Sequence, residues 1–140
     1  MNPIHGGPGP DNLLGTESVD FISGGAGNDT IYGLGGSDTL MGGGGNDRIY
    51  GGLGRDVIYG DAGNDTIVVN DQPDYIYLSG DNINGGDGVD TLYIESSGRN
   101  VADILFVKIG EVTNVEKIHI QSGWKVVIHD LPPERSLTLM

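Results

Sequence analysis

An aspartate recurs every nine residues through the first half of this chain, and an aliphatic residue follows each aspartate two positions later. Glycines fill most of the five positions before it. The aspartates are Asp11, Asp20, Asp29, Asp38, Asp47, Asp56, Asp65 and Asp74, and the aliphatic residues are Leu13, Ile22, Ile31, Leu40, Ile49, Ile58, Ile67 and Ile76. Neither an α-helix nor an ordinary sheet has a nine-residue period, so the pattern predicts a solenoid with a carboxylate in every turn. A ladder of carboxylates needs cations, and calcium is the first candidate.

Charge and glycine divide the 140-residue chain into two regions that meet near residue 93. The formal net charge is −13. Residues 1–93 hold 14 acidic residues against two arginines, a net charge of −12, whereas residues 94–140 hold six acidic and five basic residues. Of the 26 glycines, 23 lie in the first region. A disordered linker would not keep aliphatic residues at a fixed phase, so the glycine-rich region is expected to be folded.

Composition excludes several classes of function. The strong negative charge argues against nucleic acid as a partner, because phosphates would be repelled. The mean hydropathy is −0.17, and no run of eighteen apolar residues predicts a membrane span. The chain has no cysteine, which excludes disulfides and thiolate metal sites. The first six residues lack the charged and apolar segments of a cleaved signal peptide.

The repeating unit has the form G-G-x-G-x-D-x-U-x, where U is aliphatic. Units run without a break from GGPGPDNLL (6–14) to VNDQPDYIY (69–77), although the last has lost its glycines. The seven residues LSGDNIN (78–84) interrupt the array, and GGDGVDTLY (85–93) then restores it with Asp90 and Leu92. We therefore expect a seven-residue insertion at 78–84.

Elementary geometry turns this unit into a two-sheet coil. Glycines without a Cβ allow positive φ and sharp turns. The three residues after each aspartate suit a short strand whose middle aliphatic points inward. Two units make one coil of 18 residues, and successive coils stack at about 4.8 Å. Stacking places Asp29 beside Asp47 and Asp65 on one edge, and Asp38 beside Asp56 and Asp74 on the other.

Residues 6–93 resemble the repeats-in-toxin (RTX) family of haemolysin-type calcium-binding nonapeptide repeats. The resemblance implies an all-β fold, a right-handed parallel β-roll with 18 residues per coil. Residues 1–93 would form the roll. Residues 94–140 would form a C-terminal β cap and tail that cover the open end of the solenoid. The run Val112–Ile118 (VTNVEKI) looks like the segment that often closes arrays of this family.

The resemblance also implies where the ions bind. Each ion lies between a turn and the turn stacked on it, so that Asp65 would pair with Asp90 and Asp56 with Asp74. The earlier turn supplies its aspartate and the carbonyls of its second and fourth positions, and the later turn supplies its aspartate and the carbonyls of its first and third. The implied carbonyl ligands are Gly7, Gly9, Gly24, Ala26, Gly25, Gly27, Gly33, Gly35, Leu34, Gly36, Gly42, Gly44, Gly43, Gly45, Gly51, Leu53, Gly60, Ala62, Asp61, Gly63, Gly85 and Asp87.

Calcium suits these ligands better than other metals do. Carboxylate and carbonyl oxygens in flexible turns are calcium ligands, whereas zinc prefers His or Cys and magnesium needs tighter geometry. Two carboxylates about 5 Å apart repel by roughly 3 kcal/mol at an effective dielectric constant near 20. We expect about four to seven Ca²⁺ ions, and we expect binding and folding to be one event.

The outward side chains form a candidate binding surface. Tyr32 and Tyr50 fall on one sheet, and a more apolar set falls on the other: Phe21, Met41, Val57, Tyr59, Tyr75 and Tyr77. This Tyr-rich face would bind a glycan or protein partner, or would pack beneath the tail or the 78–84 segment, the interpretation we favour. The threonines are split between the sheets, which argues against ice binding. The sequence does not indicate the oligomeric state.

The second region reads as strands at 104–109, 115–120 and 125–129, with a turn at 122–123 and Trp124 packed on the last coil. His5, His119 and His129 do not form a pattern typical of a metal or catalytic site, and His119 is expected to face solvent or a polar groove. The acidic residues of the repeats are explained by calcium, so we expect no enzyme.

The sequence therefore predicts a calcium-folded structural module of an exported or extracellular protein. The resemblance implies secretion through a type I channel led by a C-terminal signal, with which Ser136–Met140 are compatible. Two alternatives remain open. One is an accessory module of a secreted polysaccharide-modifying enzyme or protease. The other is an adhesive or carbohydrate-binding protein of a cell or virion surface.

Overall fold

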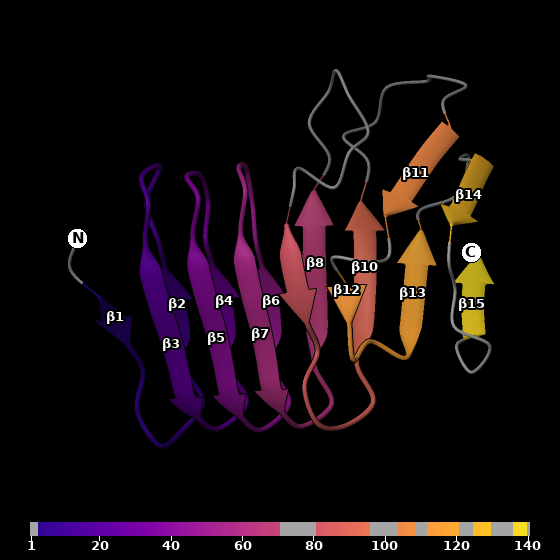
Figure 1. The fold of residues 1–140 in the computed structure, drawn as a ribbon. Helices are drawn as coiled ribbons and strands as arrows, with labels where there is room; N and C mark the ends of the chain where they lie inside the picture. The colour runs from indigo at the N-terminus through magenta and orange to yellow at the C-terminus, as the bar shows by residue number, and fades with distance from the viewer. Residues whose placement is uncertain are drawn as a thin grey trace.

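The chain folds into two parallel β-sheets that face each other across a narrow core (Figure 1). The structure is a computed structural model, and it describes residues 3–70, 81–95, 104–108, 112–120, 125–129 and 136–139. All regular structure in these residues is β, and none of it is a helix long and apolar enough to cross a membrane. The all-β, parallel β-roll architecture is thereby confirmed.

The strands alternate between the two sheets along the chain. The first sheet has the order β1-β3-β5-β7-β9-β12 and the second has the order β15-β13-β10-β8-β6-β4-β2 in the described part of the chain. The first sheet consists of β1 (Ile4–His5), β3 (Phe21–Ala26), β5 (Thr39–Gly44), β7 (Val57–Ala62), β9 (Asn82–Asn84) and β12 (Val112–Thr113). The second consists of β2 (Asn12–Leu14), β4 (Thr30–Tyr32), β6 (Arg48–Tyr50), β8 (Thr66–Asn70), β10 (Thr91–Glu95), β13 (Lys117–Ile120) and β15 (Ser136–Leu139).

The strand register confirms the coil of 18 residues. Ile22 pairs with Leu40 and Leu40 with Ile58, while Ile31 pairs with Ile49 on the opposite sheet. Each aliphatic residue therefore stacks on the one two repeats earlier, as side-chain alternation along short strands requires.

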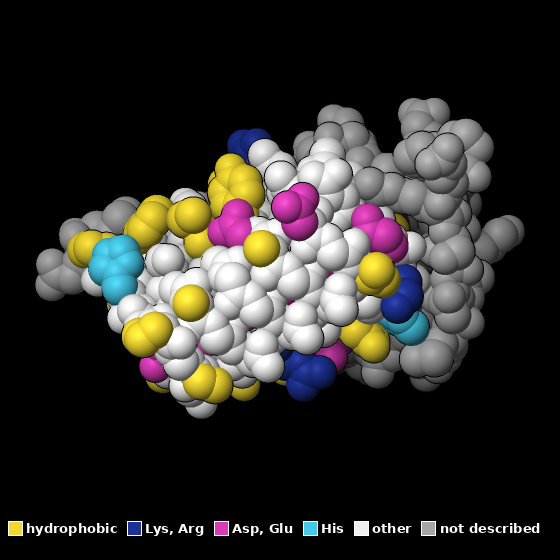
Figure 2. Space-filling view, turned by 90° about the horizontal axis from the view of Figure 1, so that it is seen from below, with side chains coloured by type: hydrophobic (Ala, Val, Ile, Leu, Met, Phe, Trp, Pro, Cys, Tyr) yellow, Lys and Arg dark blue, Asp and Glu magenta, His cyan; other side chains and the backbone are white. Residues whose placement is uncertain are grey.

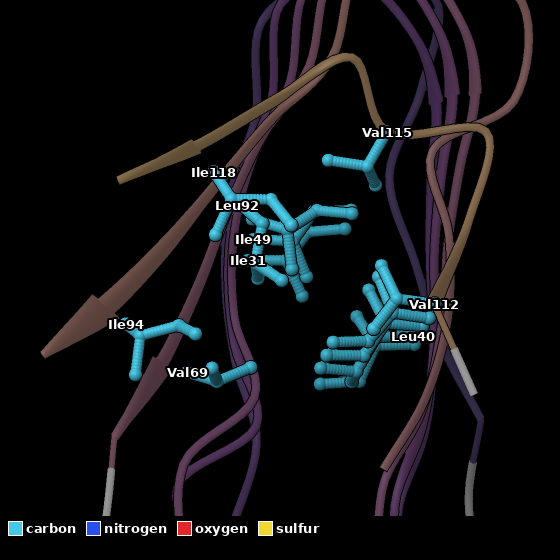
Figure 3. Packing of buried hydrophobic residues seen from close by; sticks show 13 residues of the cluster. Ile31, Leu40, Ile49, Val69, Leu92, Ile94, Val112, Val115 and Ile118 are labelled. Atoms are coloured by element: carbon cyan, nitrogen blue, oxygen red, sulfur yellow. The ribbon is translucent and has the colours of Figure 1, made fainter. Parts of the chain in front are cut away.

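The aliphatic residues of the two sheets meet in a single core (Figure 3). Ile31 and Ile49 from one sheet face Leu40 and its stacked neighbours from the other, and all three are fully buried. Other buried members are Ile22, Ile58, Ile67, Val69, Ile83, Leu92, Ile94, Val112, Val115 and Ile118. The core is only one aliphatic residue deep from each sheet, so the turns contribute a large share of the structure.

The insertion does not occupy residues 78–84 as predicted. Residues 82–84 form β9, and Ile83 pairs with Ile58, one coil and seven residues further along the chain. Asp81 and Ile83 thus occupy the places predicted for Asp74 and Ile76. Counting forward from Asp65 carried the phase through residues 69–77. Counting backward from Asp90 reaches Asp81 at the same spacing. Residues 71–80, with Asp74, Tyr75 and Tyr77, lie outside the described residues.

The second region continues the roll before it leaves it. Strand β13 pairs with β10, β15 pairs with β13, and β12 extends the first sheet beside β9. Strands β11 (Ile104–Lys108) and β14 (Lys125–His129) pair with each other in a separate sheet. The strands predicted at 104–109 and 125–129 are present, whereas the predicted strand at 115–120 begins two residues later because Val115 turns into the core. Trp124 lies outside the described residues.

Candidate metal centre

The turns of the roll form two edges, which run along the bottom and the top of Figure 1. The lower edge follows the strands of the first sheet and the upper edge follows those of the second. The lower edge carries Asp11, Asp29, Asp47, Asp65 and Asp90, and the upper edge carries Asp20, Asp38, Asp56 and Asp81. Each aspartate stands immediately before a strand, so the strand register fixes the spacing of the carboxylates.

One oxygen of each carboxylate is used to join the coils. The Oδ1 of Asp47 accepts the backbone N–H of Asp29 at 2.8 Å, and Asp65 accepts that of Asp47 at 2.8 Å. The same bond recurs on the upper edge, where Asp56 accepts the N–H of Asp38 at 2.9 Å. The aspartates therefore stack in register as predicted, and each one also satisfies a backbone donor of the coil before it.

The second oxygen of these carboxylates is buried without a partner. Six side chains share this property among the described residues, with no hydrogen bond to Oδ2: Asp29, Asp38, Asp47, Asp56, Asp65 and Asp90. None of them is more than 2% exposed. A buried charged oxygen without a partner is costly, so each of these positions calls for a proton or a cation.

The unpartnered oxygens lie beside backbone carbonyls in small spaces left by glycine. A Cβ added to Gly24, the first residue of its repeat, would lie within 3.0 Å of both Asp29 Oδ2 and the carbonyl oxygen of Gly42. The same holds for Gly33, between Asp38 Oδ2 and the Gly51 carbonyl. Gly42 and Gly60 repeat the arrangement on the lower edge with Asp47 and Asp65. These spaces bring together oxygen acceptors, which is the donor set of a hard cation.

Burial changes the protonation of these carboxylates. Desolvation raises the pKa of Asp38 and Asp56 to about 6, and that of Asp65 to about 7, from 3.8. Hydrogen bonds from the backbone oppose this rise, and neighbouring carboxylates add to it. Burial likewise raises the pKa of Asp47 and Asp90. Without a cation, the folded chain therefore holds carboxylates that favour protonation.

Glycine at the second and fourth positions of the repeat allows the turns to stack. Gly45, in the fourth position, has a φ of 124°, and Gly43, in the second, has a φ of 101°. A Cβ at either one would collide with the carbonyl of the corresponding residue one coil earlier. Leu34 and Asp61 stand in the second position with φ of 73° and 71°, so these two residues carry backbone strain.

The predicted carbonyl ligands lie in these turns, but several of them already accept backbone hydrogen bonds. Second-position carbonyls bond to the next coil, as Gly7 O does with Ala26 N at 3.0 Å. Third-position carbonyls bond to the previous coil, as Ala62 O does with Gly45 N at 2.8 Å. A carbonyl oxygen has two lone pairs, so these bonds leave room for a metal. No three His, Cys, Asp or Glu converge in the described part, so any site there must use carbonyls.

The first coil differs from the interior ones. Asp11 Oδ2 accepts the N–H of Gly7 at 2.6 Å, and Asp20 Oδ2 accepts both the N–H and the hydroxyl of Thr16. Neither oxygen is unpartnered. Thr16 in place of a glycine therefore supplies a donor at the point where the interior repeats leave the carboxylate open.

At the other end of the array, the structure corrects one predicted pair and confirms another. Asp56 N–H donates to Asp81 Oδ1 at 2.9 Å, so Asp56 stacks with Asp81 and its predicted pairing with Asp74 is wrong. The stacking of Asp65 with Asp90 is confirmed by the bond from Asp65 N to Asp90 Oδ1 at 2.8 Å. The missed aspartate could have been found from GDNIN, where an acid precedes an aliphatic residue by two positions.

A second ladder runs along the outside of the lower edge, and the sequence interpretation did not anticipate it. Asn28 Oδ1 accepts the N–H of Asn46, Asn46 Oδ1 that of Asn64, and Asn64 Oδ1 that of Val89, each at 2.8 Å. Viewed from below, this edge is mostly backbone and uncharged polar groups (Figure 2). The signal was an asparagine before the aspartate in alternate repeats.

The outer face of the second sheet carries stacked rings. Tyr32 and Tyr50 stack with centroids 4.7 Å apart and ring planes 9° from parallel, and Tyr93 stacks on His119 at 4.7 Å. His119 is half-buried, and its Nδ1 is buried without a hydrogen-bond partner. Phe21, Met41, Val57 and Tyr59 lie on the first sheet, as the sequence predicts.

Comparison with known proteins agrees with the repeat geometry. The family model of the RTX calcium-binding nonapeptide repeat matches residues 5–40, 32–67, 41–76 and 80–93. No curated protein sequence gave a significant match. A solved structure, the solution structure of the AlgE6R3 subunit from the Azotobacter vinelandii mannuronan C5-epimerase, is 25% identical and covers 69% of this chain, with a TM-score of 0.39.

The chain spans 54% of that structure, and a TM-score this low carries no argument about fold or function. The matches to the family model, by contrast, span more than half of the chain and follow the nine-residue spacing of its aspartates. With the coils, the stacked carboxylates and the glycine turns, they show that the chain belongs to the family of RTX calcium-binding nonapeptide repeat proteins.

Proposed function

We propose that this chain is a structural module whose turns bind several Ca²⁺ ions and whose folding is coupled to that binding. The observation that carries the proposal is the set of six buried carboxylate oxygens without hydrogen-bond partners. Five of them share a glycine-shaped space with a carbonyl of the next coil. No role as a catalyst is needed to explain these acidic residues.

The ligands we propose are the aspartates of each edge and the carbonyls of the turns they face. Asp29, Asp47 and Asp65 would hold ions on the lower edge, and Asp38 and Asp56 on the upper edge. Asp81 replaces Asp74 as the partner of Asp56. The first-position carbonyls, such as Gly42 O and Gly51 O, lie closest to the open oxygens. We propose four to seven ions per chain. Bound calcium supplies positive charge that satisfies the open oxygens and cancels the repulsion between stacked carboxylates.

The coupling to folding follows from the same residues. In the unfolded chain the aspartates are far apart and solvated, so their repulsion is small. Folding buries them beside one another and raises their pKa values. A thin core of single aliphatic residues must then offset this penalty. The binding free energy of the cations becomes folding free energy in such a case.

Repeats of this family are typical of extracellular and secreted proteins. We propose an extracellular setting for this chain, because free calcium is abundant there and the roll would be stable only after export. Secretion without an N-terminal signal, through a type I channel, is consistent with this order of events.

The test is circular dichroism of the whole chain during titration with calcium, magnesium and chelator. We expect a disordered spectrum in chelator, a β spectrum that grows with calcium, and little response to magnesium. Isothermal titration calorimetry would count the ions. A full β spectrum in chelator at neutral pH would sink the coupling of metal to folding. A β spectrum with no calcium uptake would sink the binding itself.

A second role, glycan binding, is favoured by the stacked rings of the second sheet. Tyr32 and Tyr50 are half-buried and nearly coplanar, and they flank the exposed Arg48. Aromatic faces pack against sugar rings, and a cation beside them suits an acidic glycan. A glycan array with Tyr50→Ala, compared with Tyr59→Ala on the other sheet, tests this role. Binding that Tyr59→Ala abolishes and Tyr50→Ala leaves intact would place the partner on the Tyr-rich face instead.

A further inference from the structure

The segment Val112–Ile120 adds one more turn to the lower edge, and this turn is shorter than a repeat. Val112 pairs with Ile83 on the first sheet, and Lys117 pairs with Thr91 on the second. The chain covers eight positions from Ile83 to Thr91, but only five from Val112 to Lys117. The coil is therefore continued with three residues missing from its turn.

Glu116 takes the place of an aspartate in the ladder. Its Oε2 accepts the backbone N–H of Asp90 at 2.7 Å, as Asp90 Oδ1 accepts that of Asp65 at 2.8 Å. The backbone follows the same register, since the N–H groups of Glu116 and Lys117 both donate to Asp90 O. Glu116 also precedes the buried Ile118 by two positions, the spacing of the repeat. The sequence EKI is thus a repeat unit with glutamate for aspartate.

Asn114 supplies the carbonyl that faces Asp90. A Cβ added to Gly85 would collide with Asn114 O and would lie 2.6 Å from Asp90 Oδ2. The two oxygens therefore border the same space, as the Gly42 carbonyl and Asp29 Oδ2 do further up the edge. Asn114 has a φ of 50°, a left-handed conformation that asparagine tolerates better than most residues.

Asp90 is fully buried, and its Oδ2 has no hydrogen-bond partner. Its surroundings are oxygen acceptors, namely the Asn114 carbonyl and the Glu116 carboxylate. Two carboxylates and a carbonyl at one buried point form the donor set of a hard cation. The same buried, unpartnered oxygen marks the interior positions of the ladder.

We infer that Asp90, the carbonyl of Asn114 and Glu116 form a further calcium site, which closes the array at its C-terminal end. The inference rests on the proposed function, because it requires that the repeat turns themselves bind calcium. The shortened turn offers fewer carbonyls than a complete repeat. Water must supply more of the coordination, so this site binds calcium more weakly than the interior sites and fills last.

The experiment compares Glu116→Gln with the unmodified full-length chain and with Glu95→Gln, a control that removes the same charge from an exposed position on β10. Glutamine keeps an oxygen that can accept the Asp90 N–H, so the backbone contact survives while the charge is lost. Calorimetric titration with calcium should show that Glu116→Gln loses one ion, or binds that ion at least about tenfold more weakly. The tighter ions should be retained, and Glu95→Gln should match the unmodified chain.

The outcomes separate this inference from the proposed function. If no variant, nor the unmodified chain, takes up calcium, the proposed function fails. If all three chains bind equal numbers of ions with equal affinities, the terminal site is wrong and Asp90 carries a proton instead. Should Glu116→Gln not fold, nuclear magnetic resonance of the unmodified chain decides. The amide signals of Asp90 and Glu116 should move late in the titration, after those of Asp29 and Asp47. Signals that stay still after the interior sites fill would overturn the inference.

Discussion

The two edges of the roll build the same carboxylate ladder from different turns. On the lower edge, glycine occupies the first position of each repeat turn, and asparagines add an outer ladder. On the upper edge, Thr16, Leu34 and Arg55 depart from the repeat, and the extra residues of the array lie before Asp81. Yet Asp38 and Asp56 are as deeply buried as Asp47 and Asp65, and their open oxygens are equivalent.

The difference teaches which parts of the repeat the metal requires. Both edges keep the aspartate and a glycine in the first position, where a Cβ would fill the space beside Oδ2. They differ in the second and fifth positions, which form the outer surface of the turn. The site therefore depends on the inner side of the turn, and the outer side can vary at the cost of local strain or of a lost hydrogen bond.

The largest test of this equivalence is to neutralise one interior aspartate on each edge. Asp47→Asn and Asp56→Asn each keep the shape of the side chain and remove a charge that two neighbouring sites share. We expect each to reduce the free energy of unfolding in saturating calcium by about 3 kcal/mol or more, because removing one partner leaves buried charge uncompensated. Urea unfolding measures the loss, with Glu17→Gln as an exposed control. A much smaller loss for Asp56→Asn would show that the upper edge binds calcium weakly or not at all.

The next largest effect separates two adjacent glycines of the lower edge. Gly45 has a φ of 124°, and a Cβ there would collide with the carbonyl of Gly27. Gly44 has no atom within 4 Å of its would-be Cβ. Gly45→Ala should cost about 1–3 kcal/mol from backbone strain alone, with the collision adding to it, whereas Gly44→Ala should be near neutral. Thermal unfolding in calcium compares them, and equal losses would contradict the stacking of the turns.

The sequence predicts the interior of both edges because the physics there is periodic. An aspartate, a glycine and an aliphatic residue at fixed spacing determine register, burial and stacking together. This is why Asp29, Asp47 and Asp65 lie where they were expected. Prediction failed where the period changed: Asp74 kept the phase of the preceding repeats, but Asp81 is the residue in the ladder.

Glu116 escaped prediction for a related reason. Its turn lacks three residues, so no nine-residue count reaches it, and its carboxylate belongs to a different residue type. Only the pairing of β12 with β9 and of β13 with β10 shows that this segment continues the lower edge. Long-range strand pairing of this kind does not leave a periodic trace in the sequence.

A third test uses pH in calcium-free buffer. The folded-state pKa values of Asp38 and Asp56 on the upper edge are raised to about 6, and that of Asp65 on the lower edge to about 7, above the ordinary 3.8. A group with a raised pKa stabilises the fold fully below its ordinary pKa and loses that contribution as the pH rises through its folded value. The metal-free roll should therefore be most stable near pH 4 and should weaken up to about pH 7.

Circular dichroism of the metal-free chain between pH 4 and 8 measures this trend, with sedimentation to detect association near the isoelectric point. Calcium should reverse the trend, because protons and cations compete for the same oxygens and calcium affinity falls with falling pH. Asp65→Asn should remove the highest part of the titration and leave the part near pH 6. A β signal that rises with pH in the absence of calcium would contradict the raised pKa values.

The smallest expected effect concerns the outer ladder, which distinguishes the edges on their exposed side. Asn46 accepts the N–H of Asn64 at 2.8 Å, and its own N–H donates to Asn28. Asn46→Ala removes one of these acceptors at a solvent-exposed position, so water can replace the bond and the loss should be about 0.5–1.5 kcal/mol. Ser37→Ala, at the same position of a repeat on the upper edge, is the matched comparison and should change stability less. Calcium stoichiometry should be unchanged in both variants, because the fifth position lies on the outer side of the turn. If Asn46→Ala instead loses an ion, the outer side of the lower edge contributes to the metal site, and the two edges bind calcium by different means.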